Sequence, residues 1–212
     1  MQKKKSAPPS YPRRPGPPQQ VRIIGGAWKR TPLPVLDALG LRPTPDRVRE
    51  TVFNWINHQL PGDWAHIDCL DLFAGSGALG FEAASRGARS VTMVDSFSPV
   101  VRQLEENKQK LKADAVSVLR ADALALARDL VQRGQRFDLI FLDPPYQKDF
   151  LSQALPLCAS LVKPGGLVYA ESGTALPFGD DAELQVPDWL APWQPVRFDK
   201  AGMVYFTLLK LL

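Results

Sequence analysis

The sequence predicts an α/β fold in which a mainly parallel β-sheet is covered by helices on both faces. From about residue 66, short apolar segments typical of strands alternate with longer helical segments. A glycine-rich stretch, DLFAGSGALG at residues 71–80, separates the first of these strands from the first helix. With 212 residues and 45% hydrophobic content, the chain has room for one such domain and a short extension.

The elements of this domain, which we place at residues 61–212, follow a regular order. Strands are expected at residues 66–73, 90–95, 115–122, 137–143 and 166–172. Helical segments stand between them at residues 78–87, 99–112, 124–134 and 150–162. Residues 195–202 and 203–212 have strand character and are expected to form a final hairpin.

The N-terminal part is expected to form a tail and a small hairpin and helix. Residues 1–20 contain six prolines and five basic residues, so they cannot bury enough apolar surface to become ordered, and we expect a disordered tail. Residues 21–36 resemble two short strands around a Gly-Gly turn, and residues 41–60 a helix. Thr44 is the expected N-cap of that helix, and Pro45 its first residue.

Positive charge is concentrated at this end of the chain. Residues 1–50 contain eleven Lys or Arg and three acids, a net charge of +8, whereas the remaining residues carry −4. This asymmetry favours a nucleic acid as partner, although a solubilising tail is an alternative. The helix buries an apolar stripe that includes Val48 and Ile56, which is expected to leave Arg47 and Arg49 facing a ligand. We interpret residues 21–60 as RNA-facing, with candidate contacts at Arg22, Lys29, Arg30, Arg42, Arg47 and Arg49.

Several classes of protein are disfavoured by what the sequence lacks. It has no apolar run of about 18 residues and no apolar segment of the kind that a secretory signal needs, so we expect a cytoplasmic protein without a membrane partner. Cys69 and Cys158 lie in apolar surroundings without the spacing of a metal site, and we expect two buried, reduced thiols. With only two histidines in the chain, no metal is expected.

The glycine-rich stretch points to a cofactor. Gly75, Gly77 and Gly80 match G-x-G-x-x-G between a strand and a helix, and Asp95 ends the next strand, as in dinucleotide-binding folds. Asp71, however, would repel a pyrophosphate and attract a cation. S-adenosylmethionine (SAM) has a sulfonium, an amino group and a ribose but no phosphate, so its charges fit better. Helix N-caps or turn residues are the alternative roles of these acids.

Residues 137–147, FDLIFLDPPYQ, place an acid, two prolines and an aromatic residue at the end of a strand. An exocyclic base amine is a poor nucleophile, because its lone pair is delocalised into the ring. Hydrogen bonds from its N–H groups to Asp143 and to the Pro144 carbonyl would localise that lone pair, while Pro145 helps to fix the backbone. Tyr146 offers a ring on which an unpaired base can stack. Because guanine presents both N1–H and a 2-amino group to a carboxylate, Asp143 favours guanine, although an adenine amine is an alternative.

Together, these motifs resemble the RsmD family of methyltransferases, which methylate the N2 amine of a guanine in 16S ribosomal RNA. The resemblance covers residues 21 to about 210, through RIIGGAWKR, LRPTPDRVRETVFNW, DLFAGSGALGFEAASRGA, DPPY and KAGMVYF. It implies a Rossmann-like class I SAM-dependent fold, with a seven-stranded, mainly parallel sheet and an antiparallel last strand. It also implies action on a small-subunit particle or assembly intermediate, and we expect a monomer.

The resemblance also assigns roles to individual residues. Asp95 takes the ribose position, and Asp122 the adenine position. The implied cofactor-binding set is Asp71, Phe73, Gly75, Ser76, Gly77, Asp95, Asp122 and Ala123, and the implied catalytic set is Asp143, Pro144, Pro145 and Tyr146. A DNA adenine-N6 methyltransferase, an NAD-dependent oxidoreductase and a non-catalytic RNA-binding module are the alternatives, of which the first would need a target-recognition domain for which this chain has no room.

Overall fold

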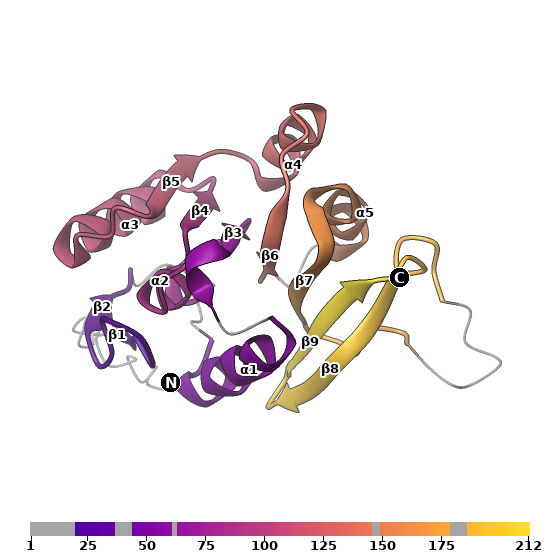
Figure 1. Cartoon of the computed structure of the whole chain (residues 1–212), viewed down its shortest axis with the longest axis horizontal. Helices are drawn as coiled ribbons and strands as arrows, with labels where there is room; N and C mark the ends of the chain where they lie inside the picture. Colours follow the sequence, from indigo (N-terminus) through magenta and orange to yellow (C-terminus); the bar gives the residue numbers. More distant parts are fainter. Residues whose placement is uncertain (1–19, 37–43, 61–62, 146–148, 179–185) are drawn as a thin grey trace, which may run out of the picture.

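The computed structural model describes residues 20–36, 44–60, 63–145, 149–178 and 186–212 (Figure 1). Its centre is a seven-stranded sheet in the order β5-β4-β3-β6-β7-β9-β8. The strands are β3 (Asp68–Asp71), β4 (Ser90–Asp95), β5 (Val116–Arg120), β6 (Phe137–Leu142), β7 (Val162–Ser172), β8 (Trp193–Ala201) and β9 (Val204–Leu211). The expected tail at residues 1–20 lies almost entirely outside the described residues, which begin at Gln20.

The pairing of the strands confirms the predicted mainly parallel sheet. All neighbours from β5 to β7 are parallel, whereas β9 runs antiparallel to both β7 and β8. The last strand is therefore antiparallel, and it forms the predicted hairpin with β8. Because the chain moves outward from β3 to β5 and then returns to β6 beside β3, the order reverses between β3 and β6. Ligands bind at the carboxyl ends of the strands at such a reversal.

In the part of the chain that the structure describes, five α-helices cover the two faces of this sheet (Figure 1). On one face, α1 (Asp46–Gln59), α2 (Ala78–Ser85) and α3 (Ser98–Leu111) bury their apolar side chains in one core. On the other face, α4 (Ala123–Gln132) and α5 (Leu151–Leu161) form the second core. The predicted buried thiols are confirmed, since Cys69 and Cys158 are free and buried. None of the helices in the described part of the chain is both long and apolar enough to cross a membrane.

The N-terminal segment forms the small hairpin that the sequence predicts, from β1 (Gln20–Arg22) and β2 (Pro32–Pro34). A buried carboxylate, that of Glu82 in α2, holds the loop between these strands by accepting hydrogen bonds from the N–H groups of Ile24, at 2.7 Å, and Gly25, at 2.8 Å. Ser85 Oγ accepts a further one from the Trp28 N–H, at 2.9 Å. Hydrogen bonds from backbone N–H groups of this loop to side chains of α2 therefore hold the hairpin against the main domain.

One local prediction is wrong. Pro45, rather than Thr44, is the N-cap of α1, and no side chain caps this helix. The Thr44 hydroxyl instead donates a hydrogen bond to Glu171 at the end of β7, at 2.8 Å. The Thr44 side chain therefore bonds to the distant Glu171 carboxylate instead of capping its own helix, because the start of α1 lies against the carboxyl edge of the sheet.

Candidate active site

The carboxyl edge of the sheet carries an acid at the end of four strands. Asp71 ends β3, Asp95 ends β4, Asp143 directly follows β6, and Glu171 is the penultimate residue of β7. β3, β6 and β7 are neighbours, and their register places Asp71 opposite Phe141 and Leu142 opposite Ala170. Three acids therefore lie side by side across the reversal of the strand order, where a ligand is expected.

The glycine loop between β3 and α2 has the geometry of a close-approach site. Gly77 is the N-cap of α2 and has a φ of 78°, in the left-handed region that favours glycine. A Cβ at Gly77 would lie 2.6 Å from the Phe81 ring. Gly80 packs against Met93 of β4, which shows that the third glycine permits close contact between helix and strand.

Asp71 is a buried carboxylate in which one oxygen has no hydrogen-bond partner. It is 1% exposed; its Oδ2 accepts from the Gly80 N–H at 3.1 Å, whereas its buried Oδ1 has no hydrogen-bond partner. Burial raises the pKa of Asp71 to about 7, and the nearby charge of Asp95 also raises it. An orphaned buried acceptor is costly, which indicates that a ligand group completes it.

Asp95 and the residues of the loop line the approach to the same edge. Asp95 Oδ2 accepts from the Gly75 N–H at 3.1 Å, and Oδ1 accepts from the Phe97 N–H at 2.8 Å. Burial raises the pKa of Asp95. Ser76 Oγ accepts from the Ala78 N–H at 3.3 Å, and the Phe73 ring packs against Phe150 across 5.2 Å. The carboxylate of Asp95 thus fixes the loop, and its role toward a ribose stays a prediction.

At the end of β5, Asp122 takes the alternative role that the sequence allowed. It is the N-cap of α4, and its side chain accepts from the Ala125 N–H at 2.8 Å. Ala123, the first residue of that helix, is buried. A capping carboxylate retains free lone pairs, so contact with an adenine amine stays a prediction for Asp122.

Asp143, one of the catalytic candidates, lies at the edge of a buried hydrogen-bond network. Thr44 Oγ1 lies 3.4 Å from Asp143 Oδ2 and donates to Glu171 Oε1, which also accepts from the Tyr169 hydroxyl at 2.8 Å. Pro144 is buried and Pro145 is exposed. Tyr146, the expected stacking residue, lies outside the described residues.

The electrostatics of this cluster favour a cationic ligand. Burial, followed by the charges of Glu171 and Asp71, holds the pKa of Asp143 well above its ordinary value. Within the described part of the chain, no Lys or Arg is among the groups that shift the pKa of Asp143 or Asp71. A carboxylate with an unpaired oxygen, with no Lys or Arg among these described neighbours, fits the positive methionine end of SAM. The described residues contain no group of His, Cys, Asp and Glu arranged to hold a metal.

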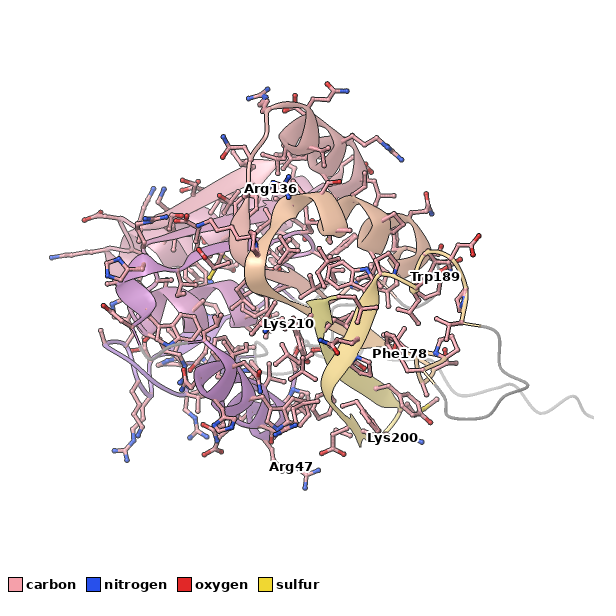
Figure 2. The ribbon with its side chains drawn as sticks, turned by 45° about the vertical axis from the view of Figure 1, so that its right-hand side comes forward. Arg47, Arg136, Phe178, Trp189, Lys200 and Lys210 are labelled. Carbon is pink, nitrogen blue, oxygen red and sulfur yellow. The ribbon has the colours of Figure 1, made fainter. Side chains whose placement is uncertain are left out.

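A pocket of about 300 Å³ opens beside the catalytic candidates. Its lining includes Pro144, Leu151, Glu171, Ser172, Leu176 and Trp189. This volume is at the lower end of the range for small-molecule pockets, ~300–1,000 Å³, and suits one planar group. Figure 2 shows Trp189 on the side of the molecule that also carries the β8–β9 hairpin.

The structure separates the basic residues of the N-terminal segment into two groups. Arg22, Lys29, Arg30 and Arg47 are exposed, and Arg22 forms an ion pair with Asp46 at 2.7 Å. The expectation that Arg49 faces a ligand is wrong.

The Arg49 side chain is fully buried, with Nη2 2.6 Å from Asp46 Oδ1 and Nη1 3.8 Å from Glu82 Oε2. It also donates to the backbone carbonyls of Thr44 and Arg22. Arg49 therefore joins α1 to α2 and to the hairpin, a structural role. Arg42 lies outside the described residues.

Two members of the site were not among the predicted residues. Glu171 follows the apolar run of β7, so the rule that picked out Asp71 and Asp143, an acid at the carboxyl end of a strand, would have found it. Thr44 gave no such signal, because a Thr before a helix is an ordinary cap.

Fold and site together define a class I SAM-dependent methyltransferase. The family model described as conserved hypothetical protein 95 matches residues 21–210. The chain is 38% identical over 191 residues to ribosomal RNA small subunit methyltransferase D of Escherichia coli K12, a match that covers 89% of each protein. It is 41% identical over 193 residues to the Haemophilus influenzae protein of the same name, covering 89% of this chain and 93% of that protein.

Solved structures agree with these sequence matches. A putative methyltransferase, yhhF, from Escherichia coli has a TM-score of 0.74 and 37% identity, covering 91% of this chain and 98% of that one. SMU.776, a putative methyltransferase complexed with SAH, shares the fold with a TM-score of 0.66 at 16% identity, covering 93% and 57% of the two chains. The chain belongs to the family of ribosomal RNA small subunit methyltransferase D, the RsmD family that its motifs resemble. The oxidoreductase and the non-catalytic module are thereby excluded.

Proposed function

We propose that this protein transfers a methyl group from SAM to the exocyclic N2 amine of a guanine in 16S ribosomal RNA. Membership of the RsmD family supports ribosomal RNA of the small subunit as substrate. Relatives with 38% and 41% identity are named ribosomal RNA small subunit methyltransferase D. The observation that carries the choice of base is that Pro144 and Glu171 line a pocket of about 300 Å³. Asp143 directly precedes Pro144, and the Thr44 hydroxyl connects it to Glu171. Carboxylates accept from both donors on the guanine edge, N1–H and the 2-amino group.

The cofactor is assigned to the glycine-loop side of the cluster. Asp71, with its orphaned Oδ1, would hold the cationic methionine end of SAM, Asp95 the ribose hydroxyls and Asp122 the adenine amine. When bound, SAM supplies an electrophilic methyl group on a sulfonium. Gly75 and Gly77 keep the loop free of side chains where the ligand approaches.

The base is assigned to the pocket on the other side of Asp143. Asp143 accepts a hydrogen bond from the N2 amine, which raises electron density on the nitrogen, and then takes up the proton that the amine loses. The Pro144 carbonyl is the second acceptor, held in place by the rigid proline backbone. Glu171 and Thr44 position Asp143 through their shared hydrogen bonds, and Trp189 supplies an aromatic wall. A base in this position must be flipped out or single-stranded.

Transfer of labelled methyl from SAM to small-subunit RNA, purified from cells that lack this protein, tests the proposal. The reaction should yield N2-methylguanine in 16S RNA and no other methylated base. A DNA adenine methyltransferase would give 6-methyladenine, and that product would contradict the proposal. We further propose that the protein acts as a monomer, and that its substrate is a small-subunit particle or an assembly intermediate. Comparing methyl transfer to naked 16S RNA and to small-subunit particles tests the choice of substrate.

A further inference from the structure

The β8–β9 hairpin ends beside the pocket. On β9, Tyr205 pairs with Ser172 of β7 on one side and with Lys200 of β8 on the other. Ser172 lines the pocket. The hairpin end is therefore at the carboxyl edge of β7, directly beside the strand that carries Glu171.

Unusually exposed apolar groups lie at this end. Phe198 is 75% exposed and Met203, in the hairpin turn, is 81% exposed. The turn is tight, since Gly202 has a φ of 62°, which the first central residue of a two-residue hairpin turn often requires. Lys200 Nζ lies 4.6 Å from the centre of the Tyr205 ring, so a cation already covers an aromatic face here.

The pairing of β8 with β9 shows which of these side chains lie on the same face of the hairpin. Phe198 pairs with Thr207 and Lys200 pairs with Tyr205, and these positions are two residues apart on each strand, so all four share one face. Asp199 pairs with Phe206 and lies on the opposite face, toward α1, where Phe206 stacks on Trp55. The exposed face thus combines aromatic rings with a positive charge and excludes the neighbouring acid. Figure 2 shows Lys200 at the lower end of the hairpin, below Phe178 and Trp189.

This combination favours single-stranded nucleic acid. Proteins that bind single strands join aromatic rings, on which bases stack, to cations that follow the backbone. A protein partner would need no cation over a ring, and a membrane surface would need several basic residues. Building on the proposed function, we propose that the hairpin face formed by Phe198, Lys200 and Tyr205, with Met203 at its end, holds the unpaired nucleotides next to the target guanine.

The test measures binding of 16S RNA, without turnover, by Phe198→Ala and Lys200→Gln, with Lys210→Gln as a matched control near the other end of β9. Phe198→Ala should weaken RNA binding about tenfold, the factor that ~1.4 kcal/mol of stacking represents. Lys200→Gln should reduce the slope of log affinity against log salt by about 0.7, as expected for one contact to a single strand. Lys210→Gln should resemble the wild type, and SAM affinity and melting temperature should be unchanged in all three.

Two results would overturn this inference while leaving the proposed function intact. One is wild-type methyl transfer to guanine together with equal RNA affinity in Phe198→Ala and Lys200→Gln. The other is loss of binding to small-subunit particles with normal binding to naked 16S RNA, which would mean that the face contacts a ribosomal protein. Failure of the wild type to methylate guanine would instead overturn the proposed function.

Discussion

The hydroxyl of Thr44 donates a hydrogen bond to Glu171 across 2.8 Å, joining the segment before α1 to the end of β7. Both side chains are buried, and the same hydroxyl lies 3.4 Å from Asp143. The N-terminal extension, which the charge pattern predicts to face RNA, therefore also contacts the edge of the sheet that carries the catalytic candidates. Changes in this segment are expected to alter chemistry as well as substrate binding.

Glu171→Gln should shift the pH dependence of methyl transfer. Burial raises the pKa of Asp143, and the charges of Glu171 and then Asp71 raise it further. Gln keeps the acceptor for Thr44 and Tyr169 but removes that charge, so the pKa of Asp143 falls and the acid limb of the kcat profile moves to lower pH. An acid limb at the wild-type position would show that Glu171 does not act on Asp143.

Asp71→Asn should change stability in a pH-dependent way. Burial raises the pKa of Asp71 to about 7 in the folded protein, above the ordinary value of 3.8, so the folded state retains a proton that the unfolded state loses. The contribution of Asp71 to the free energy of unfolding is therefore fully present below pH 4 and is lost as the pH rises through 7. The amount lost is on the order of 4 kcal/mol. Asn does not titrate, so the stability of the variant relative to wild type should increase between pH 4 and 8. Denaturant unfolding at several pH values checks this, and a constant difference would contradict it.

SAM affinity should depend on Asp95. Replacement by Ala removes an acceptor for ribose hydroxyls and the acceptor for the Gly75 N–H, while the basic N-terminal residues are untouched. Calorimetry should therefore show weaker SAM binding, with RNA binding close to that of the wild type. Unchanged SAM affinity would mean that Asp95 serves only the loop.

Arg49→Ala should destabilise the fold rather than weaken RNA contacts. The substitution leaves the fully buried carboxylate of Glu82 with one cation fewer and removes hydrogen bonds to the carbonyls of Thr44 and Arg22. Breaking a buried ion pair from one side typically costs about 3–5 kcal/mol. Denaturant unfolding checks this, with Arg47→Ala, at an exposed position of the same helix, as the control that should stay near the wild-type value.

The sequence was most informative where a residue's role depends on its own strand or loop. Asp71, Asp95 and Asp143 follow apolar runs, and the parallel topology brings such positions to one edge whatever the details of packing. Gly77 was recognisable for the same reason, since its backbone conformation belongs to the loop itself.

Arg49 and Thr44 were misassigned because their partners come from distant parts of the chain. Glu82 lies 33 positions after Arg49 and sits in a helix whose pattern gives no reason to expect an acid in the core. The acceptor of Thr44 is 127 positions away, so the local rule for helix caps gave the wrong partner. Tertiary ion pairs and hydrogen bonds of this kind carry no periodic signal.

Methyl transfer by Asp143→Ala, measured together with SAM affinity, tests the proposed chemistry at its centre. The substitution removes the acceptor for the target amine but leaves the glycine loop, Asp71 and Asp95 in place. Transfer to 16S RNA should fall by about 10²–10⁴-fold, the usual contribution of a positioned acid or base, while SAM affinity changes little. Asp143→Asn should also be strongly impaired, because the amide can present an N–H donor to the guanine N1–H. A transfer rate for Asp143→Ala within about threefold of the wild type, far less than the tenfold that ~1.4 kcal/mol represents, would mean that the DPPY segment only ends a strand.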